Sequence, residues 1–251
     1  MRFLILILTA LTFMTFAAPS FAQDLPRESL IGFTETEKVG FAFYHLINKN
    51  PPYLDWITTR PDYMKSTPGD RMKIMDYERI RLRDGFANYQ VDRDMILVKL
   101  PLLYTLIDNP DYLTNDDARN KGLIKRLLVS IPDSKTPYFP FQVGKFWVGV
   151  IPQGLEKDMQ IDLSEEEYNV LARGIVDGTN FKNKSMVTTV ILKPIMADEK
   201  SPMVENKMPV FLMMSDVASL SIRGLSEELL WGYTAPWYLG AKSQELMTLH
   251  K

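Results

Sequence analysis

A histidine base beside a nucleophile is the commonest catalytic arrangement, and this chain offers little material for one. Only two histidines, His45 and His250, occur among the 251 residues, and there is no cysteine. No G-x-S-x-G sequence presents a serine, and His250 is the penultimate residue, so we expect His45 to be structural. The lack of thiols excludes a cysteine nucleophile, a thiolate zinc site and an iron–sulfur cluster. From the residue types present we therefore predict no catalytic residue, no metal site and no cofactor.

Paired carboxylates could support acid–base chemistry without histidine. Three groups come close in the sequence: Asp76 with Glu78, Asp116 with Asp117, and the run 165–167. Residues two apart do not share a helix face, and acids in a first helical turn are explained by the helix dipole. A hydrolase would therefore need two acids brought together from distant segments.

Arginine is densest at Arg79, Arg81 and Arg83. On a helix Arg79 and Arg83 share a face, and Arg81 points elsewhere. Glu78 precedes Arg81 by three positions, a spacing that favours an intrahelical ion pair. We take Arg79 and Arg83 as candidate binding residues for an anionic sugar or lipid headgroup, the alternative being a solvated face.

Aromatic residues gather in two proline-containing segments. Tyr53 and Trp56 precede Arg60-Pro61, and Trp231 and Trp237 flank Ala235-Pro236. Aromatic side chains on loops form adhesive surfaces, and tryptophan and tyrosine are enriched in binding hot spots. We take these four as candidate binding residues; the alternatives are packing over a core or, for the tail, docking on a neighbouring copy in a homo-oligomer.

The first 22 residues resemble a secretory signal peptide. Arg2 is followed by an uncharged apolar run from Phe3 to Phe16, too short to span a bilayer comfortably. Small residues at Ser20 and Ala22 then form an A-x-A type cleavage site, so the mature chain would begin at Gln23. No later stretch is apolar enough to span a membrane. An exported chain without cysteine suits a bacterial periplasm, so we expect a periplasmic or secreted protein.

Helical patterns occupy the part from about 35 to 90. Thr34 with Glu37 forms a capping box before an amphipathic helix over 35–48. Thr67-Pro68 begins a second helix, over about 69–88. We expect its core stripe to include four apolar residues, Met72, Met75, Leu82 and Phe86.

Strand patterns dominate from about 91 to 224. We expect one or two strands over 95–107, broken at Pro101, and further strands over 123–131, 138–151, 159–163, 186–192 and 210–214. A capping box, Ser164 with Glu167, begins one inserted helix that runs to about 175. The unit over 159–192 has the order of a parallel crossover, and 226–231 suits a short final helix.

This order predicts an α+β protein, with N-terminal helices followed by a mostly antiparallel sheet with one inserted helix. We expect a single domain over 23–251, with an aromatic tail over 225–251. A net charge of −2 argues against nucleic acid. The sequence favours a non-catalytic binding or accessory protein of the cell envelope, whose partner would be an envelope protein or glycan; the alternative is a carboxylate-dependent hydrolase acting on an envelope polymer.

Overall fold

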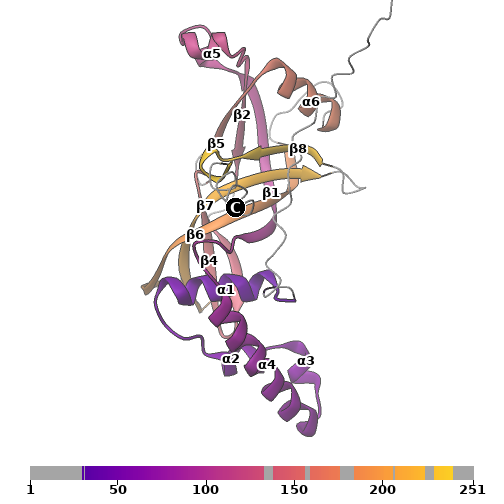
Figure 1. The fold of residues 1–251 in the computed structure, drawn as a ribbon, viewed down its shortest axis with the longest axis vertical. Helices are drawn as coiled ribbons and strands as arrows, with labels where there is room; N and C mark the ends of the chain where they lie inside the picture. Colours follow the sequence, from indigo (N-terminus) through magenta and orange to yellow (C-terminus); the bar gives the residue numbers. More distant parts are fainter. Residues whose placement is uncertain are drawn as a thin grey trace, which may run out of the picture.

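The computed structural model describes residues 30, 32–132, 138–155, 159–175, 184–205, 207–223 and 229–239. The predicted signal peptide, 1–22, and the end of the aromatic tail lie outside these residues. The architecture is α+β, as predicted: helices come first, and a mostly antiparallel sheet of eight strands follows (Figure 1).

Two N-terminal helices confirm the sequence patterns. Helix α1 (Glu35–Leu46) begins at Thr34 with both hydrogen bonds of the predicted capping box. Helix α4 (Pro68–Asn88) begins at Thr67, whose side chain accepts a hydrogen bond from the backbone N–H of Asp70. Each helix therefore starts where local capping chemistry places it.

The segment between these helices corrects the prediction of loops. Residues 53–58 form α2 (Tyr53–Thr58) and residues 61–65 form α3 (Pro61–Lys65), with Pro61 in the first turn of α3. The proposed core stripe of α4 is also partly wrong, because Met72 is 71% exposed whereas Leu82 is buried. Helices α3 and α4 extend away from the sheet at the bottom of Figure 1, so part of α4 has little to pack against.

The sheet has the order β3-β4-β7-β6-β1-β2-β5, and β8 also pairs with β7. All neighbours are antiparallel except β4 and β7, which are parallel. The bounds are β1 (Ile96–Asp108), β2 (Lys125–Ser130), β3 (Phe139–Val143), β4 (Phe146–Gln153), β5 (Met159–Leu163), β6 (Lys184–Glu205), β7 (Met208–Arg223) and β8 (Leu229–Thr234).

Strand β1 continues through Pro101 rather than breaking there. Pro101 lies opposite Val187 of β6, whereas the pairing of β1 with β2 begins only at Leu103. Over this stretch β1 therefore has one neighbour instead of two. A proline is tolerated in such edge-like positions because its missing N–H need not serve a second ladder.

Three other strand predictions need correction. The single strand expected over 138–151 is a hairpin, β3 and β4, which turns at Gly144 with a φ of 63°. The strands expected over 186–192 and 210–214 are the centres of the much longer β6 and β7. Residues 229–231, expected in a final helix, begin strand β8; residues 224–228 lie outside the described part. Finally, β5 and β6 are not neighbours, so no parallel crossover forms there.

Smaller helices occupy the opposite end of the molecule from α3 and α4. The connection from β1 to β2 carries η2 (Pro110–Tyr112) and α5 (Asp116–Asn120). Helix α6 (Glu165–Ile175) is the predicted inserted helix, and its capping box is present, with the Ser164 N–H donating to Glu167. The molecule is elongated, with these helices at one end and α1–α4 at the other (Figure 1).

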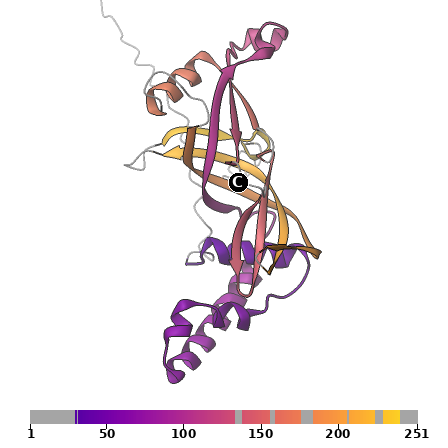
Figure 2. The same ribbon diagram turned by 180° about the vertical axis from the view of Figure 1, so that it is seen from behind.

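One continuous cluster of buried side chains joins the N-terminal helices to the sheet. Helix α1 packs against β1, β3, β4 and β6, and its apolar residues Val39, Phe41 and Phe43 are buried in that contact. Seen from behind, the β3–β4 hairpin reaches down to the helices (Figure 2). The helical end and the tip of this hairpin are therefore held against each other.

Candidate functional site: a cleft at the helical end

A cleft of about 800 Å³ lies where the helices meet the β3–β4 turn. This volume falls within the range of about 300–1,000 Å³ that is usual for small-molecule sites. Its walls come from the start of α1, the α2–α3 junction, α4 and the hairpin turn. The lining residues are Gly32, Thr34, Thr36, Glu37, Trp56, Thr59, Arg60, Pro61, Asp62, Tyr77, Glu78, Arg81, Leu82, Gln142, Val143 and Gly144.

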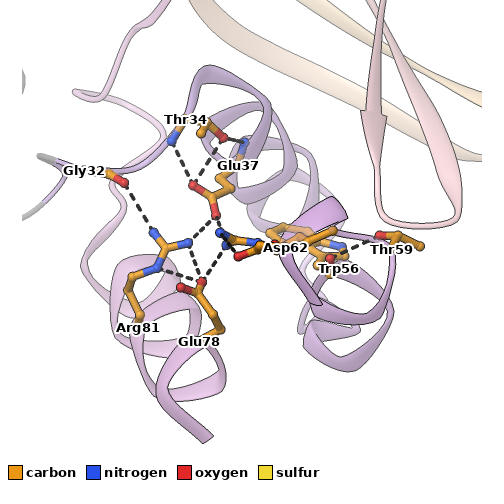
Figure 3. Close-up of polar contacts among 9 residues, drawn as sticks. Gly32, Thr34, Glu37, Trp56, Thr59, Asp62, Glu78 and Arg81 are labelled. Carbon is orange, nitrogen blue, oxygen red and sulfur yellow. Dashed lines mark hydrogen bonds and ion pairs between the residues drawn. The ribbon is translucent and has the colours of Figure 1, made fainter. Parts of the chain in front are cut away.

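Four charged groups form a closed ring in the cleft (Figure 3). Arg60 Nη1 lies 2.7 Å from Glu78 Oε2 and 3.6 Å from Glu37 Oε1. Arg81 Nη2 contacts the same two carboxylate oxygens, at 2.7 Å for Glu78 and at shorter range for Glu37. Positive and negative groups therefore alternate around the ring, and each guanidinium bridges both glutamates.

The ring joins three segments that are distant in the sequence. Glu37 sits in the first turn of α1, where its Oε2 also accepts hydrogen bonds from the N–H and hydroxyl of Thr34. Arg60 is the N-cap residue of α3. Glu78 and Arg81 lie one turn apart on α4, and Glu78 is only 7% exposed. Breaking the ring would thus loosen the contacts among these helices.

The arginines in the ring have every side-chain nitrogen engaged. Arg60 donates through Nε and Nη2 to the Asp62 carboxylate, at 3.1 and 3.2 Å, in addition to Nη1. Arg81 donates through Nε to Glu78 and through Nη1 to the carbonyl oxygen of Gly32. The ring of Phe33 packs 4.6 Å from the Arg81 guanidinium carbon.

Two pKa shifts follow from these contacts. Hydrogen bonding to Arg60 holds the pKa of Asp62 below its ordinary value, against a smaller opposing effect of burial. Burial acts to lower the pKa of Arg81, but its hydrogen bonds to Glu37 and Glu78 together outweigh burial and raise that pKa. The ionised forms are therefore the stable forms of these groups in the folded chain.

Trp56 forms the inner wall of the cleft and is buried. Its indole is held between glycines of two elements: a Cβ added at Gly40 of α1 would lie 2.5 Å from Cη2, and one at Gly144 would lie 2.8 Å from Cδ1. Its ring also stacks against Phe41. The indole Nε1 is buried without a hydrogen-bond partner among the described residues. Buried polar groups in proteins rarely lack such a partner.

The structure brings only one of the six sequence-predicted binding residues into the cleft, namely Trp56. Tyr53 lies on α2 with its ring 6.3 Å from that of Trp56, and it does not line the cleft. Burial raises the pKa of the Tyr53 hydroxyl, and the charge of Arg83 partly opposes this. Trp56 is buried and Tyr53 is partly buried against the core, so neither stands on an exposed loop.

Arg79 and Arg83 lie on the exposed face of α4 and do not line the cleft. Arg83 forms an ion pair with its neighbour Asp84, at 3.0 Å. The two positions share a helix face as expected, and it is the solvated one. Arg81, which the sequence places on the other face, is the arginine that enters the cleft.

Trp231 and Trp237 have different environments. Trp231 lies in β8, is 6% exposed and packs edge-on against Tyr104. Trp237 is 41% exposed and lies 5.8 Å from Lys193 Nζ. The described part of the tail thus docks on its own sheet, and Trp231 is a core residue without free surface for a partner.

The other candidates for chemistry have structural partners. His45 contacts the carbonyl oxygen of Phe86 through Nε2 at 2.8 Å and stacks on its ring. Asp116 pairs with Arg119 of the same short helix, and Asp117 pairs with Lys121, its C-cap residue. Within the described ranges, no group of three acidic or histidine side chains has the arrangement of a metal site.

Sequence reasoning found part of the charged ring and missed the rest. The spacing of Glu78 and Arg81 predicted their ion pair, and the capping box identified Glu37. Arg60 was missed: its segment was expected to be a loop, and its partner Glu78 is 18 positions away. Tyr77 and Gln142 carried no sequence signal of their own.

Three comparisons of the chain with known proteins found no similar one. No protein-family model matches it. Neither the curated proteins nor the solved structures yield a significant match. Among the helices that the structure describes, none has the length and apolar character needed to cross a membrane.

Proposed function

We propose that the chain is an exported protein of the bacterial cell envelope, periplasmic or secreted, which binds an envelope component in the cleft without catalysing a reaction. The signal-like segment 1–22 supports export. The cleft supports binding, because it is the place where side chains from four helices and a hairpin turn converge.

The observation that carries this proposal is that the carboxylate oxygens in the ring already accept hydrogen bonds from other groups of the protein. Both oxygens of Glu37 accept hydrogen bonds, from Thr34 and from Arg81. Oε2 of Glu78 accepts from both Arg60 and Arg81. A hydrolytic acid must carry a proton, and a base must have a free lone pair facing the substrate. Both oxygens of Glu37 and one of Glu78 are thus engaged in holding the helices, and Glu78 is only 7% exposed, which favours binding over hydrolysis.

The first experiment tests export. The full chain is expressed in a Gram-negative host, and the protein is recovered from the periplasmic fraction and weighed by mass spectrometry. A mass that begins at Gln23 supports the proposal. Recovery from the cytosol with Met1 still attached contradicts it.

The second experiment tests the cleft. The exported protein is immobilised and exposed to an envelope extract, beside the variants Tyr77→Ala in the cleft and Met72→Ala on the same helix outside it. Both side chains are exposed, at 67% and 71%, so neither change should unfold the chain. We expect the wild type and Met72→Ala to retain the same component and Tyr77→Ala to lose it.

Two outcomes of this capture would count against the proposal. Equal retention by all three proteins would show that the cleft is not the binding surface. Recovery of the component in cleaved form from the wild type, but intact from Glu37→Gln, would replace binding by the hydrolase alternative.

A further inference from the structure

We infer that the cleft binds an uncharged oligosaccharide segment. This inference rests on the proposed binding function and specifies the chemical class of its ligand. It follows from the charges in the cleft, from the groups that remain available there, and from the strand at its edge.

The two arginines of the cleft face three carboxylates, Glu37, Asp62 and Glu78, so the lining carries a net charge of −1 and both guanidinium groups are paired. All three side-chain nitrogens of Arg60 donate to Glu78 and Asp62, and all three of Arg81 donate to Glu37, Glu78 or Gly32. An anion would have to displace one of these carboxylates and would also meet the excess negative charge. A cation would have to compete with Arg60, which donates a hydrogen bond to each oxygen of Asp62. Such an exchange would leave a part-buried charged group without its ion-pair partner, which is unfavourable. A neutral ligand needs no exchange.

The groups that remain available match the two faces of a sugar ring. Tyr77 is an exposed aromatic residue that lines the cleft, and the C–H face of a pyranose can pack against such a ring. Thr36, Thr59 and Gln142 line the walls with hydroxyl and amide groups. The Thr59 hydroxyl donates to the carbonyl oxygen of Asp55, and the Gln142 amide nitrogen donates to that of Gly144, but the hydroxyl and amide oxygens can still accept hydrogen bonds from sugar hydroxyls. Sites for small polar ligands combine an apolar surface with a few polar groups in this way.

An extended peptide suits the cleft less well. Strand β3, which contributes Gln142 and Val143, ends the sheet and pairs only with β4 among the described strands. A peptide could add to such an edge by backbone hydrogen bonds. However, β3 carries Pro140, which has no N–H to donate, and proline on an edge strand hinders strand addition.

The test uses oligosaccharides of one length and different charge. The neutral probes are maltotetraose, cellotetraose and tetra-N-acetylchitotetraose. The deacetylated chitotetraose, assayed at mildly acidic pH, is the cationic counterpart, and tetragalacturonate is the anionic one. Binding to the exported protein is followed by calorimetry and by tryptophan fluorescence, because Trp56 forms the inner wall.

We expect saturable binding of at least one neutral probe, with weaker or undetectable binding of its charged counterparts. Tyr77→Ala should weaken binding about tenfold, as truncation of an aromatic hot spot does. Met72→Ala, on the same helix outside the cleft, should leave binding unchanged.

The outcomes that would overturn the inference differ from those that overturn the function. One outcome is that no neutral sugar binds at millimolar concentration, whereas a charged probe, or a tetrapeptide made neutral by acetylation and amidation, binds in a Tyr77-dependent manner. In that case the inferred ligand class is wrong, but the binding function stands. If no neutral probe binds and the envelope capture also retains nothing beyond the Tyr77→Ala background, both are wrong.

Discussion

Arg60 Nη1 lies 2.7 Å from Glu78 Oε2, so that the N-cap residue of α3 is joined to the most buried acid of α4. The two residues are 18 positions apart, and the ion pair belongs to the ring that includes Glu37 and Arg81. Because α3 has only five residues, it would have little stability by itself. This contact, together with the hydrogen bonds from Arg71 to the carbonyl oxygens of Tyr63 and Met64, holds α3 in the cleft wall.

Replacing Glu78 by alanine should destabilise the fold by about 3 kcal/mol, because it leaves two guanidinium groups without their shared partner in a part-buried setting. Urea denaturation followed by circular dichroism measures the change. Asp76→Ala, two positions away on the exposed face, is the matched control and should stay within about 0.5 kcal/mol of the wild type. Equal effects of the two substitutions would show that the ring contributes nothing to stability.

The β3–β4 turn should be sensitive to a single added methyl group at Gly144. Gly144 and Gly122 have almost the same positive φ, 63° and 62°, so alanine strains the backbone of both by about 1 kcal/mol. Only at Gly144 would the new Cβ meet another group, 2.8 Å from Trp56 Cδ1; at Gly122 nothing lies within 4 Å.

We therefore expect Gly144→Ala to lose about 1–3 kcal/mol more than Gly122→Ala in thermal or urea unfolding. The emission of Trp56 should change in the first variant alone. Matching losses in both variants would mean that the turn does not hold the indole in place.

The two tryptophans of the tail should differ in their contribution to stability. Trp231→Ala removes a buried side chain that packs on Tyr104, and it should cost about 3–5 kcal/mol. Trp237→Ala removes a half-exposed ring and should cost about 1 kcal/mol or less. Differential scanning calorimetry gives both values. A similar cost for both would contradict the placement of β8 in the core.

The pH dependence of stability should include a small contribution from Asp62. Its pKa in the folded chain lies below the ordinary value of 3.8 because Arg60 donates two hydrogen bonds to it. A lowered pKa contributes stability that is present above the ordinary value and is lost as the pH falls through the folded value. The Asp62 side chain is 52% exposed, so solvent screening keeps this contribution below about 1 kcal/mol.

The variant Asp62→Asn should thus be less stable than the wild type at neutral pH, and the gap should close as the pH falls below the ordinary pKa of 3.8. Urea midpoints across this range test the expectation, and added salt should narrow the gap at neutral pH. A gap that stays constant with pH would assign the effect of the substitution to something other than the charge.

Local signals in the sequence predicted the elements whose causes are local. The capping boxes at Thr34 and Ser164 marked the starts of α1 and α6, and Thr67-Pro68 marked that of α4. The α+β class followed from the order of helical and alternating patterns. In each case the interacting residues lie within one turn of each other or on one strand, so a window of sequence contains the whole cause.

Strand lengths and neighbours depended on contacts across the chain. Pairing with β7 extends β6 to Glu205 through residues that carry little strand pattern, and the parallel contact of β4 with β7 joins residues more than sixty positions apart. Strand formation responds to such partners more than to intrinsic preference. The extents of β6 and β7 therefore could not be predicted from their own residues.

The sequence by itself determined the absence of thiol chemistry, the main helices, the fold class and the ion pair of Glu78 with Arg81. The tertiary structure alone decided that Arg60 and Glu37 close a ring around that pair, that Trp231 is buried, and that Tyr77 faces a cleft with Trp56 behind it. The reason is physical: capping and i,i+3 contacts act over a few residues, whereas a cleft exists only where helices and a hairpin distant in the sequence pack together.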